Sequence, residues 1–194
     1  MTRARAIVGL LLAVPATVQA EPRADGPCFG VFGQISPIIA VFDYPADGHG
    51  PSEKAALDLG VGGDVSRCRG WLELGVGARY DFADGAVDNA HFFAVPLWIG
   101  ARLRIGAKGS LRLAVGAGPG FGVVVRNSTL ITFGPSAEIV LGAGYRVGPE
   151  LVLAIEIGAR LDKLREINSD DAYLDGGELL HAQIPVFRAG ATWR

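Results

Sequence analysis

Apolar residues alternate with polar residues or glycine along most of the chain after residue 28. Between residues 72 and 82, for example, Leu74 and Val76 share one parity, whereas Glu73, Arg79 and Asp81 share the other. Side chains in a strand alternate between two faces, and the many glycines inside these segments disfavour helix. The pattern predicts eight strands, each with one apolar face, over residues 28–42, 55–66, 71–82, 91–105, 110–125, 130–147, 150–162 and 179–193.

The connections between these segments alternate between short and mostly longer ones. Residues 66–70, 106–109 and 148–149 are short turns, whereas residues 43–54 and 163–178 are long. Strands that run up and down would place the short turns at one end and the long loops at the other. Two all-β architectures fit: a soluble barrel with an apolar interior, and an antiparallel up-and-down transmembrane β-barrel with a polar interior.

The charged residues favour the transmembrane barrel. Its interior would collect arginines, carboxylates and glycines, whereas a solvated face normally carries Lys, Glu, Ser and Thr. All three lysines, Lys54, Lys108 and Lys163, are expected in connections. A charge on the lipid face at mid-bilayer costs about 2–4 kcal/mol for Arg or Lys. We therefore predict a charge-paired, largely plugged lumen, lined by Asp58, Asp64, Glu73, Arg79, Asp81, Arg102, Arg104, Arg112, Glu138, Arg146, Glu156 and Arg160.

Aromatic residues on the apolar parity fall at two levels, as in the interfacial girdles of membrane barrels. The level near the long loops has Phe82, Phe93, Phe121 and Phe133, and the level near the short turns has Phe29, Tyr145 and Trp193.

The first twenty residues have the organisation of a secretory signal peptide. Arg3 and Arg5 precede an apolar stretch over residues 6–14, and small residues end the segment at Val18 and Ala20. We expect residues 1–20 to be a signal peptide and residues 21–194 to be the barrel domain. The formal net charge of −2 gives no basic footprint for nucleic acid.

The chain has two cysteines, Cys28 and Cys68, both near the short-turn end of the predicted topology. In an oxidising compartment an even number of cysteines suggests a disulfide, here between the first strand and the second turn. Without a CxxC motif or a Cys/His cluster, no metal site and no cofactor are expected.

The whole mature pattern resembles the small eight-stranded outer-membrane barrels of Gram-negative bacteria, the OmpA/OmpX-like group. Proteins of that group end in an assembly signal, and the stretch from Arg188 through Gly190 to Trp193 is similar to its first six positions; Arg194 then ends the sequence without the final aromatic residue. The resemblance implies a bacterial outer-membrane location and a monomer. Its implied partners are outer-membrane lipid, lipopolysaccharide and the barrel-assembly machinery.

Five prolines interrupt five different predicted strands in the half nearer the long loops. Because proline cannot donate to a strand ladder, such positions indicate either locally loosened pairing or bulges, or a lateral gap that lets an apolar molecule pass between lumen and membrane. The five are Pro37, Pro96, Pro119, Pro135 and Pro185.

Catalytic chemistry has little support. His49, His91 and His181 all fall toward the long loops, but His181 has no neighbouring hydroxyl in its strand. The acidic long loops could bind divalent cations or simply form a solvated rim. The sequence predicts no catalytic residue and favours a structural or surface-interaction role in the cell envelope. The alternatives are passage of small or hydrophobic solutes through the lumen or the lateral gap, and a lipid-modifying enzyme.

Overall fold

The computed structural model describes residues 18–19, 26–43, 52–84, 89–125, 129–167 and 178–193. The predicted signal peptide lies outside this part of the chain, apart from the pair Val18–Gln19. That pair forms the short strand β1, which lies antiparallel to Ile105 and Arg104 of strand β6.

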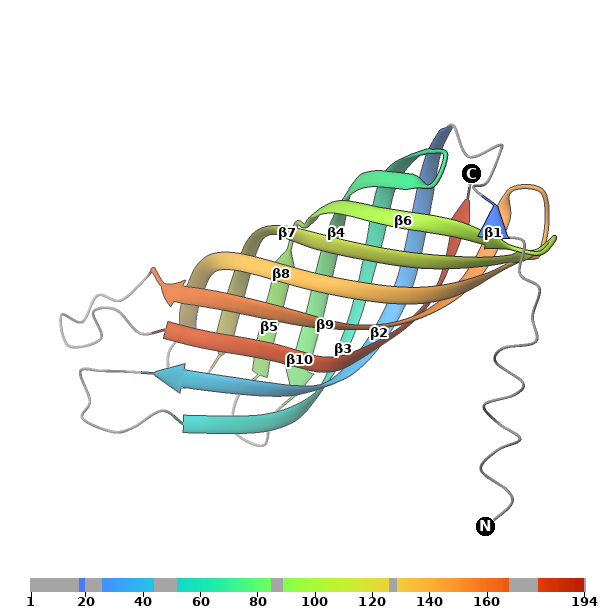
Figure 1. The fold of residues 1–194 in the computed structure, drawn as a ribbon. Helices are drawn as coiled ribbons and strands as arrows, with labels where there is room; N and C mark the ends of the chain where they lie inside the picture. The colour runs from blue at the N-terminus through green and yellow to red at the C-terminus, as the bar shows by residue number, and fades with distance from the viewer. Residues whose placement is uncertain are drawn as a thin grey trace, which may run out of the picture.

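The remaining strands form a closed antiparallel barrel (Figure 1). Consecutive strands pair around the wall, and the last strand, β10, pairs with β2 to close it. The strands are β2 (Gly26–Asp43), β3 (Ser52–Arg69), β4 (Leu72–Asp84), β5 (Asn89–Ala94), β6 (Leu97–Ile105), β7 (Gly109–Val125), β8 (Thr129–Arg146), β9 (Leu151–Glu166) and β10 (Glu178–Trp193).

The eight predicted segments all form strands of the wall, with two differences in detail. First, β5 and β6 are one barrel strand interrupted at Val95 and Pro96. Second, β3 and β9 are longer than expected, so the prediction that Lys54 and Lys163 lie in connections was wrong. The transmembrane part of a strand needs only about 9–11 residues. Strand pairing therefore continues beyond the apolar band, where a charge costs little.

The short turns all lie at one end of the barrel, called the turn end below; they join β3 to β4, β6 to β7 and β8 to β9. Gly70 and Gly106 occupy these turns with φ of 61° and 62°, a left-handed conformation that glycine adopts without a Cβ clash. The other connections leave the opposite end, called the loop end.

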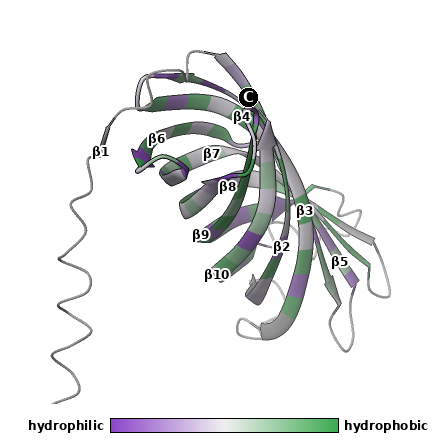
Figure 2. Cartoon of the chain, turned by 90° about the vertical axis from the view of Figure 1, so that its right-hand side faces the viewer, coloured by the Kyte–Doolittle hydropathy of each residue, from purple (hydrophilic) through white to green (hydrophobic). Residues whose placement is uncertain are grey.

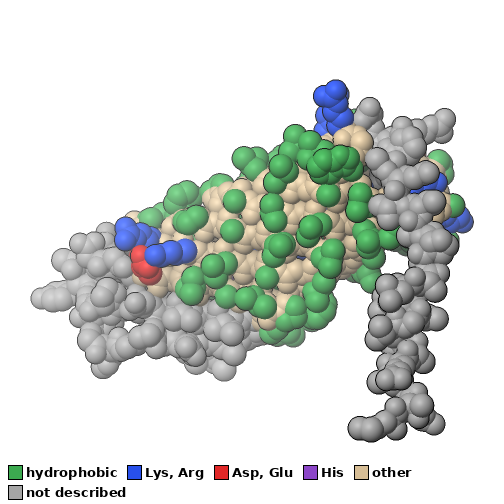
Figure 3. Space-filling view, in the orientation of Figure 1, with side chains coloured by type: hydrophobic (Ala, Val, Ile, Leu, Met, Phe, Trp, Pro, Cys, Tyr) green, Lys and Arg blue, Asp and Glu red, His purple; other side chains and the backbone are tan. Residues whose placement is uncertain are grey.

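Hydrophilic and hydrophobic residues alternate along the strands (Figure 2), and their burial separates polar from apolar side chains as predicted. Large aliphatic residues such as Leu97 and Ile155 are exposed on the outside, whereas Asp81 and Asp162 are fully buried in the lumen. On the outer surface seen in Figure 3, hydrophobic side chains cover the middle and charged ones gather at the two ends. No helix in the described part of the chain is long and apolar enough to cross a membrane.

The sequence suggested a lumen that is polar throughout, but one part of the lumen is apolar. At the loop end, inward residues of β4, β5, β7, β9 and β10 form a buried apolar cluster, called the apolar layer below. Its members are Ala83, Ala90, Phe92, Val124, Leu164 and Leu179. This layer lies beyond the charged residues, between them and the loop end of the barrel.

Candidate functional site: the charged lumen

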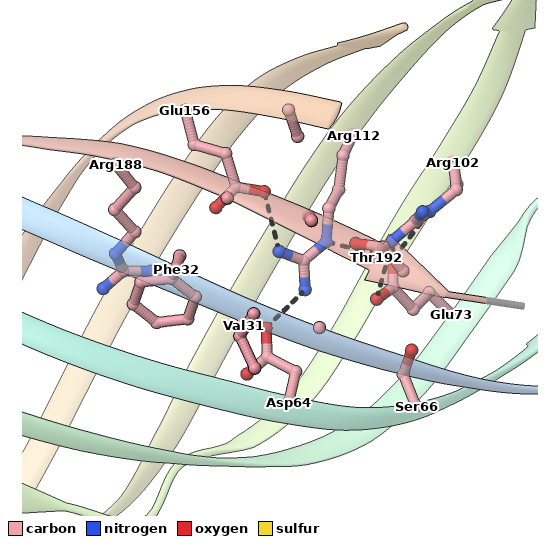
Figure 4. A pocket seen from close by; sticks show the side chains of 14 residues that line it. Val31, Phe32, Asp64, Ser66, Glu73, Arg102, Arg112, Glu156, Arg188 and Thr192 are labelled. Atoms are coloured by element: carbon pink, nitrogen blue, oxygen red, sulfur yellow. Dashed lines mark hydrogen bonds and ion pairs between the residues drawn. The ribbon is translucent and has the colours of Figure 1, made fainter. Parts of the chain in front are cut away.

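Arg112 of β7 is the centre of a charge cluster in the turn-end half of the lumen (Figure 4). Its guanidinium lies 3.1 Å from Glu73, 2.9 Å from Glu156 and 3.7 Å from Asp64. Arg102 contacts the same Glu73 carboxylate at 3.1 Å. These five residues come from β3, β4, β6, β7 and β9, so the cluster spans the lumen.

Arg79 extends this cluster toward the middle of the barrel. It lies 2.8 Å from Asp64 and 3.2 Å from Glu138. Its guanidinium is stacked between Phe32 and Trp98, with 4.5 and 4.7 Å to the two ring centroids. Planar guanidinium groups combine such stacking with bidentate pairing, which an ammonium group cannot do.

Glycine on the inner face makes room for these long side chains. A Cβ on Gly77 would lie 2.5 Å from both Arg79 Nη1 and Asp64 Oδ1, and one on Gly62 would lie 2.3 Å from the Phe32 ring. An eight-stranded barrel has an interior just wide enough for side chains to fill. The glycines of the polar parity therefore allow two layers of side chains to pack across it.

A second cluster lies between the first cluster and the apolar layer. Arg160 pairs with Asp81 and, at 3.0 Å, with Asp162. His181 Nδ1 lies 2.7 Å from Asp162, and its Nε2 lies 3.6 Å from Asp58. All five side chains are almost completely buried.

Two glutamines complete this second cluster. Gln183 donates to Asp58, and Gln34 donates to Asp81 while accepting a 2.8 Å hydrogen bond from Arg188. Arg188 in turn pairs with Glu138, which links the two clusters into one network.

The network leaves little free space. The cavity beside Arg112, Glu73 and Glu156 has a volume of about 30 Å³. That is room for one or two water molecules. Among the described residues, no group of three His, Cys, Asp or Glu side chains is placed to hold a metal ion. The chemistry of this interior is ion pairing across the barrel.

Solved structures of other proteins share this barrel architecture. No protein-family profile and no curated protein matches the sequence. The structure of Neisserial surface protein A matches with a TM-score of 0.57 at 10% identity, over 87% of this chain and 98% of that one. The outer membrane protein OprG from Pseudomonas aeruginosa matches with a TM-score of 0.55 at 12% identity, over 88% and 96%. The fold is that of the small eight-stranded outer-membrane β-barrels. The resemblance expected from the sequence is confirmed at this level.

Of the twelve predicted lumen charges, the barrel brings ten into the two clusters. The other two, Arg104 and Arg146, lie beside a small crevice at the turn end. The place of Arg104 in the charge network stays a prediction, because among the described residues it donates to the carbonyls of Gly106 and Ala107. These hydrogen bonds reflect its position one residue from the end of β6, where unpaired turn carbonyls are within reach.

Cys28 and Cys68 form a small buried cluster at the turn end of the barrel, as two thiols rather than a disulfide. Cys28 lies opposite Ser66, and Cys68 lies opposite Gly26, so the two cysteines are diagonal neighbours. Diagonal neighbours have Cα atoms about 7–8 Å apart, beyond the usual ~4.4–6.8 Å of a disulfide. The predicted disulfide is not formed in the structure, and its formation after export stays a prediction.

The predicted proline gap coincides with local irregularities, but the wall remains paired around them. Pro119 lies directly opposite Pro135. The β8–β9 ladder is interrupted at Gly134 and Pro135, which have no paired residue on β9. At the interruption between β5 and β6, the N–H of Val95 donates to Pro119, and the Pro96 carbonyl accepts from Gly77.

The remaining two prolines, Pro37 and Pro185, lie in the neighbouring strands β2 and β10. Pro37 keeps its register partner Leu57, and Pro185 lies in a bulge of β10 between Gln183 and Val186. A lateral gap at these positions stays a prediction.

Residues of the predicted assembly signal divide between the two faces of β10. Arg188 is buried in the charge network, Gly190 faces inward against Phe32, and Trp193 is exposed on the outside at the turn end. Recognition by the assembly machinery stays a prediction.

The histidines show two different settings, and His49 lies outside the described residues. His91 is on the outer face, where its Nδ1 is 2.9 Å from the Tyr80 hydroxyl. His181 was not among the predicted site residues. Its inward parity, shared with Gln183, is the signal that could have placed it in the network.

Proposed function

We propose that this protein is a monomeric outer-membrane barrel whose lumen is sealed, with a structural or surface-interaction role in the cell envelope. The observation that carries the proposal is the set of buried guanidinium groups held across the lumen. Each contacts carboxylates from other strands, and the five are Arg79, Arg102, Arg112, Arg160 and Arg188. Opening a water-filled pore would require these guanidinium groups to separate from their carboxylate partners.

Energetics support a closed lumen. Removing one partner from a buried ion pair costs about 3–5 kcal/mol, because the other charge is left without compensation. Several such contacts would have to break together to open a passage. The apolar layer around Phe92 adds a second barrier, since hydrophobic constrictions exclude water and ions.

Conductance tests the proposal. The processed barrel, refolded and inserted in planar lipid bilayers, should give the same current as protein-free membranes, with a general porin as the positive control. Reproducible unitary current steps from the wild-type barrel would overturn the sealed lumen. Charge-selective leakage of small solutes from liposomes would do the same.

The proposed partners follow from the outer surface of the barrel and from its loop end. The apolar outer band would contact lipid, and lipopolysaccharide would surround the loop end, since long loops of such barrels are extracellular. The barrel-assembly machinery would recognise β10. No catalytic role is assigned to His181, because both of its ring nitrogens face carboxylates.

Passage of hydrophobic solutes is the second candidate, and a groove on the outer wall favours it. The groove has a volume of about 750 Å³ and is lined by Gly33, Gly63, Ala78 and Ala189, with Tyr80 and Phe93 among its larger lining residues. Phe93 lies two residues from the β5–β6 interruption. If solutes use this route, Pro96→Val should slow the uptake of an apolar fluorophore into proteoliposomes. Uptake equal to that of empty vesicles by both proteins would remove this candidate.

A further inference from the structure

Two cations stand on the lipid-facing parity of β9 at the loop end. Lys163 and Arg165 continue the outward series of Ile155, Ile157 and Leu161 along the same strand. Their side chains are 60% and 73% exposed. They therefore project from the wall near the loop-end edge of its apolar band, where Ile167 is the next exposed residue on the same parity.

Neighbouring strands mark this level as the boundary between hydrocarbon and water. Phe133 of β8 lies opposite Arg165 and is exposed on the outer face, as expected for an aromatic girdle. On the other side, Leu180 of β10 lies opposite Lys163 and also faces outward. Phe133 thus lies beside Arg165, Leu180 lies beside Lys163, and the exposed Leu161 precedes both cations on β9.

A shared carboxylate holds the two cations in place. Glu178 of β10 lies 3.2 Å from Lys163 Nζ and 3.4 Å from Arg165 Nε. The pKa of Glu178 is lowered, first because Lys163 donates a hydrogen bond to it. With Glu178 ionised, the trio carries one net positive charge.

The trio retains free hydrogen-bonding capacity. Glu178 accepts from Nε and Nη2 of Arg165, whereas a guanidinium has five N–H donors and an ammonium has three. Both cationic groups are exposed, so further donors can meet an anion from the membrane side.

We infer that Lys163 and Arg165 form a binding site for the phosphate of an anionic lipid in the outer leaflet, namely the phosphorylated head group of lipid A. The inference rests on the proposed outer-membrane location, with the loop end outward. Guanidinium and ammonium groups are the usual partners of phosphate. A lipid phosphate is favoured over a free anion because the side chains leave the wall toward the bilayer, at head-group level.

Lipid binding to the folded, full mature barrel in detergent tests this site. Native mass spectrometry would measure its affinity for diphosphoryl lipid A, for the same lipid without phosphates, and for inorganic phosphate. The test variant is Lys163→Gln with Arg165→Gln, which keeps polar side chains near Glu178. The matched control is Arg67→Gln with Arg69→Gln, since these two cations face outward at the opposite, turn end of the barrel. Heat-modifiable gel migration verifies that each variant is folded.

The expected result is a loss of roughly 10–30-fold in affinity for diphosphoryl lipid A in the test variant, with little change in the control. Equal affinities of wild type and test variant would overturn the site. So would equal losses in both variants, or equal binding of the lipid without phosphates. Displacement of the lipid by low-millimolar inorganic phosphate would show a free-anion site instead. Conductance plays no part in these measurements, so failure here is distinguishable from failure of the sealed lumen.

Discussion

The phenyl ring of Phe92 lies flat against the imidazole of His181, with ring centroids 3.9 Å apart and an interplanar angle of 11°. Phe92 belongs to the apolar layer, and His181 belongs to the second charge cluster with Asp58 and Asp162. This contact joins the two kinds of packing that fill the lumen. It also explains how an apolar layer can rest on an ionic one, since a flat aromatic face covers the ring without competing for its nitrogens.

Phe92→Ala should destabilise the barrel far more than Phe93→Ala. The two neighbours differ in direction: Phe92 is 1% exposed and faces the lumen, whereas Phe93 is 42% exposed and faces outward. Removing a buried phenylalanine costs about 3–5 kcal/mol, because a cavity remains. Urea unfolding in lipid vesicles would measure both changes. Similar losses for both variants would contradict the assigned faces.

Arg112→Ala should lower the free energy of unfolding by about 3–5 kcal/mol, since it leaves Glu73, Glu156 and Asp64 without their shared cation. Arg104→Ala is the matched control, because among the described residues Arg104 donates to exposed turn carbonyls. We expect a change within about 0.5 kcal/mol for the control. If the two arginine variants unfold at the same denaturant concentration, paired burial around Arg112 is wrong.

Gly134→Ala should strain the β8–β9 contact. A Cβ at residue 134 would lie 2.0 Å from the carbonyl oxygen of Lys163, so one backbone must move away. Such overpacking costs about 1–3 kcal/mol. Gly148→Ala in the β8–β9 turn should be tolerated, because its Cβ would meet nothing within 4 Å. Thermal unfolding in detergent would compare them, and equal unfolding temperatures would show that the two strands do not approach so closely.

Cys28 and Cys68 give a prediction about the exported protein. The thiols already touch at the turn end, so oxidation after export needs only a small shift of the diagonal pair. Alkylation of the denatured, unreduced protein should then leave both cysteines unmodified, and reduction should expose both. Full alkylation before reduction would show that the exported barrel keeps two thiols.

Strand parity could be read from the sequence because it depends only on neighbouring residues. Alternation alone puts Glu73, Arg79 and Asp81 on one face of their strand, and all three are buried in the structure. Which acid meets which base could not be predicted, because the tilt and stagger of the strands set the neighbours across the lumen. The contact of Arg79 on β4 with Glu138 on β8 is one example.

Two further features could not be predicted from the local sequence pattern. The bulge in β10 moves the inward parity from His181 and Gln183 to Val186 and Arg188, so a strict alternation fails at Pro185. The apolar layer was missed because the rule of a polar interior hides inward residues such as Leu164. Their inward parity was visible in the sequence, but their mutual contact depends on strands far apart along the chain.

The three tryptophans test directly whether the apolar face meets lipid while the charged face lines a sealed lumen. Trp71 and Trp193 are 55% and 45% exposed on the outside, whereas Trp98 is 3% exposed and donates to Asp64 inside the lumen. Single-tryptophan variants, with the other two replaced by phenylalanine, would be refolded in vesicles containing brominated lipid. This orientation predicts strong quenching of Trp71 and Trp193 and little quenching of Trp98. Strong quenching of Trp98 with the other two unaffected would contradict it.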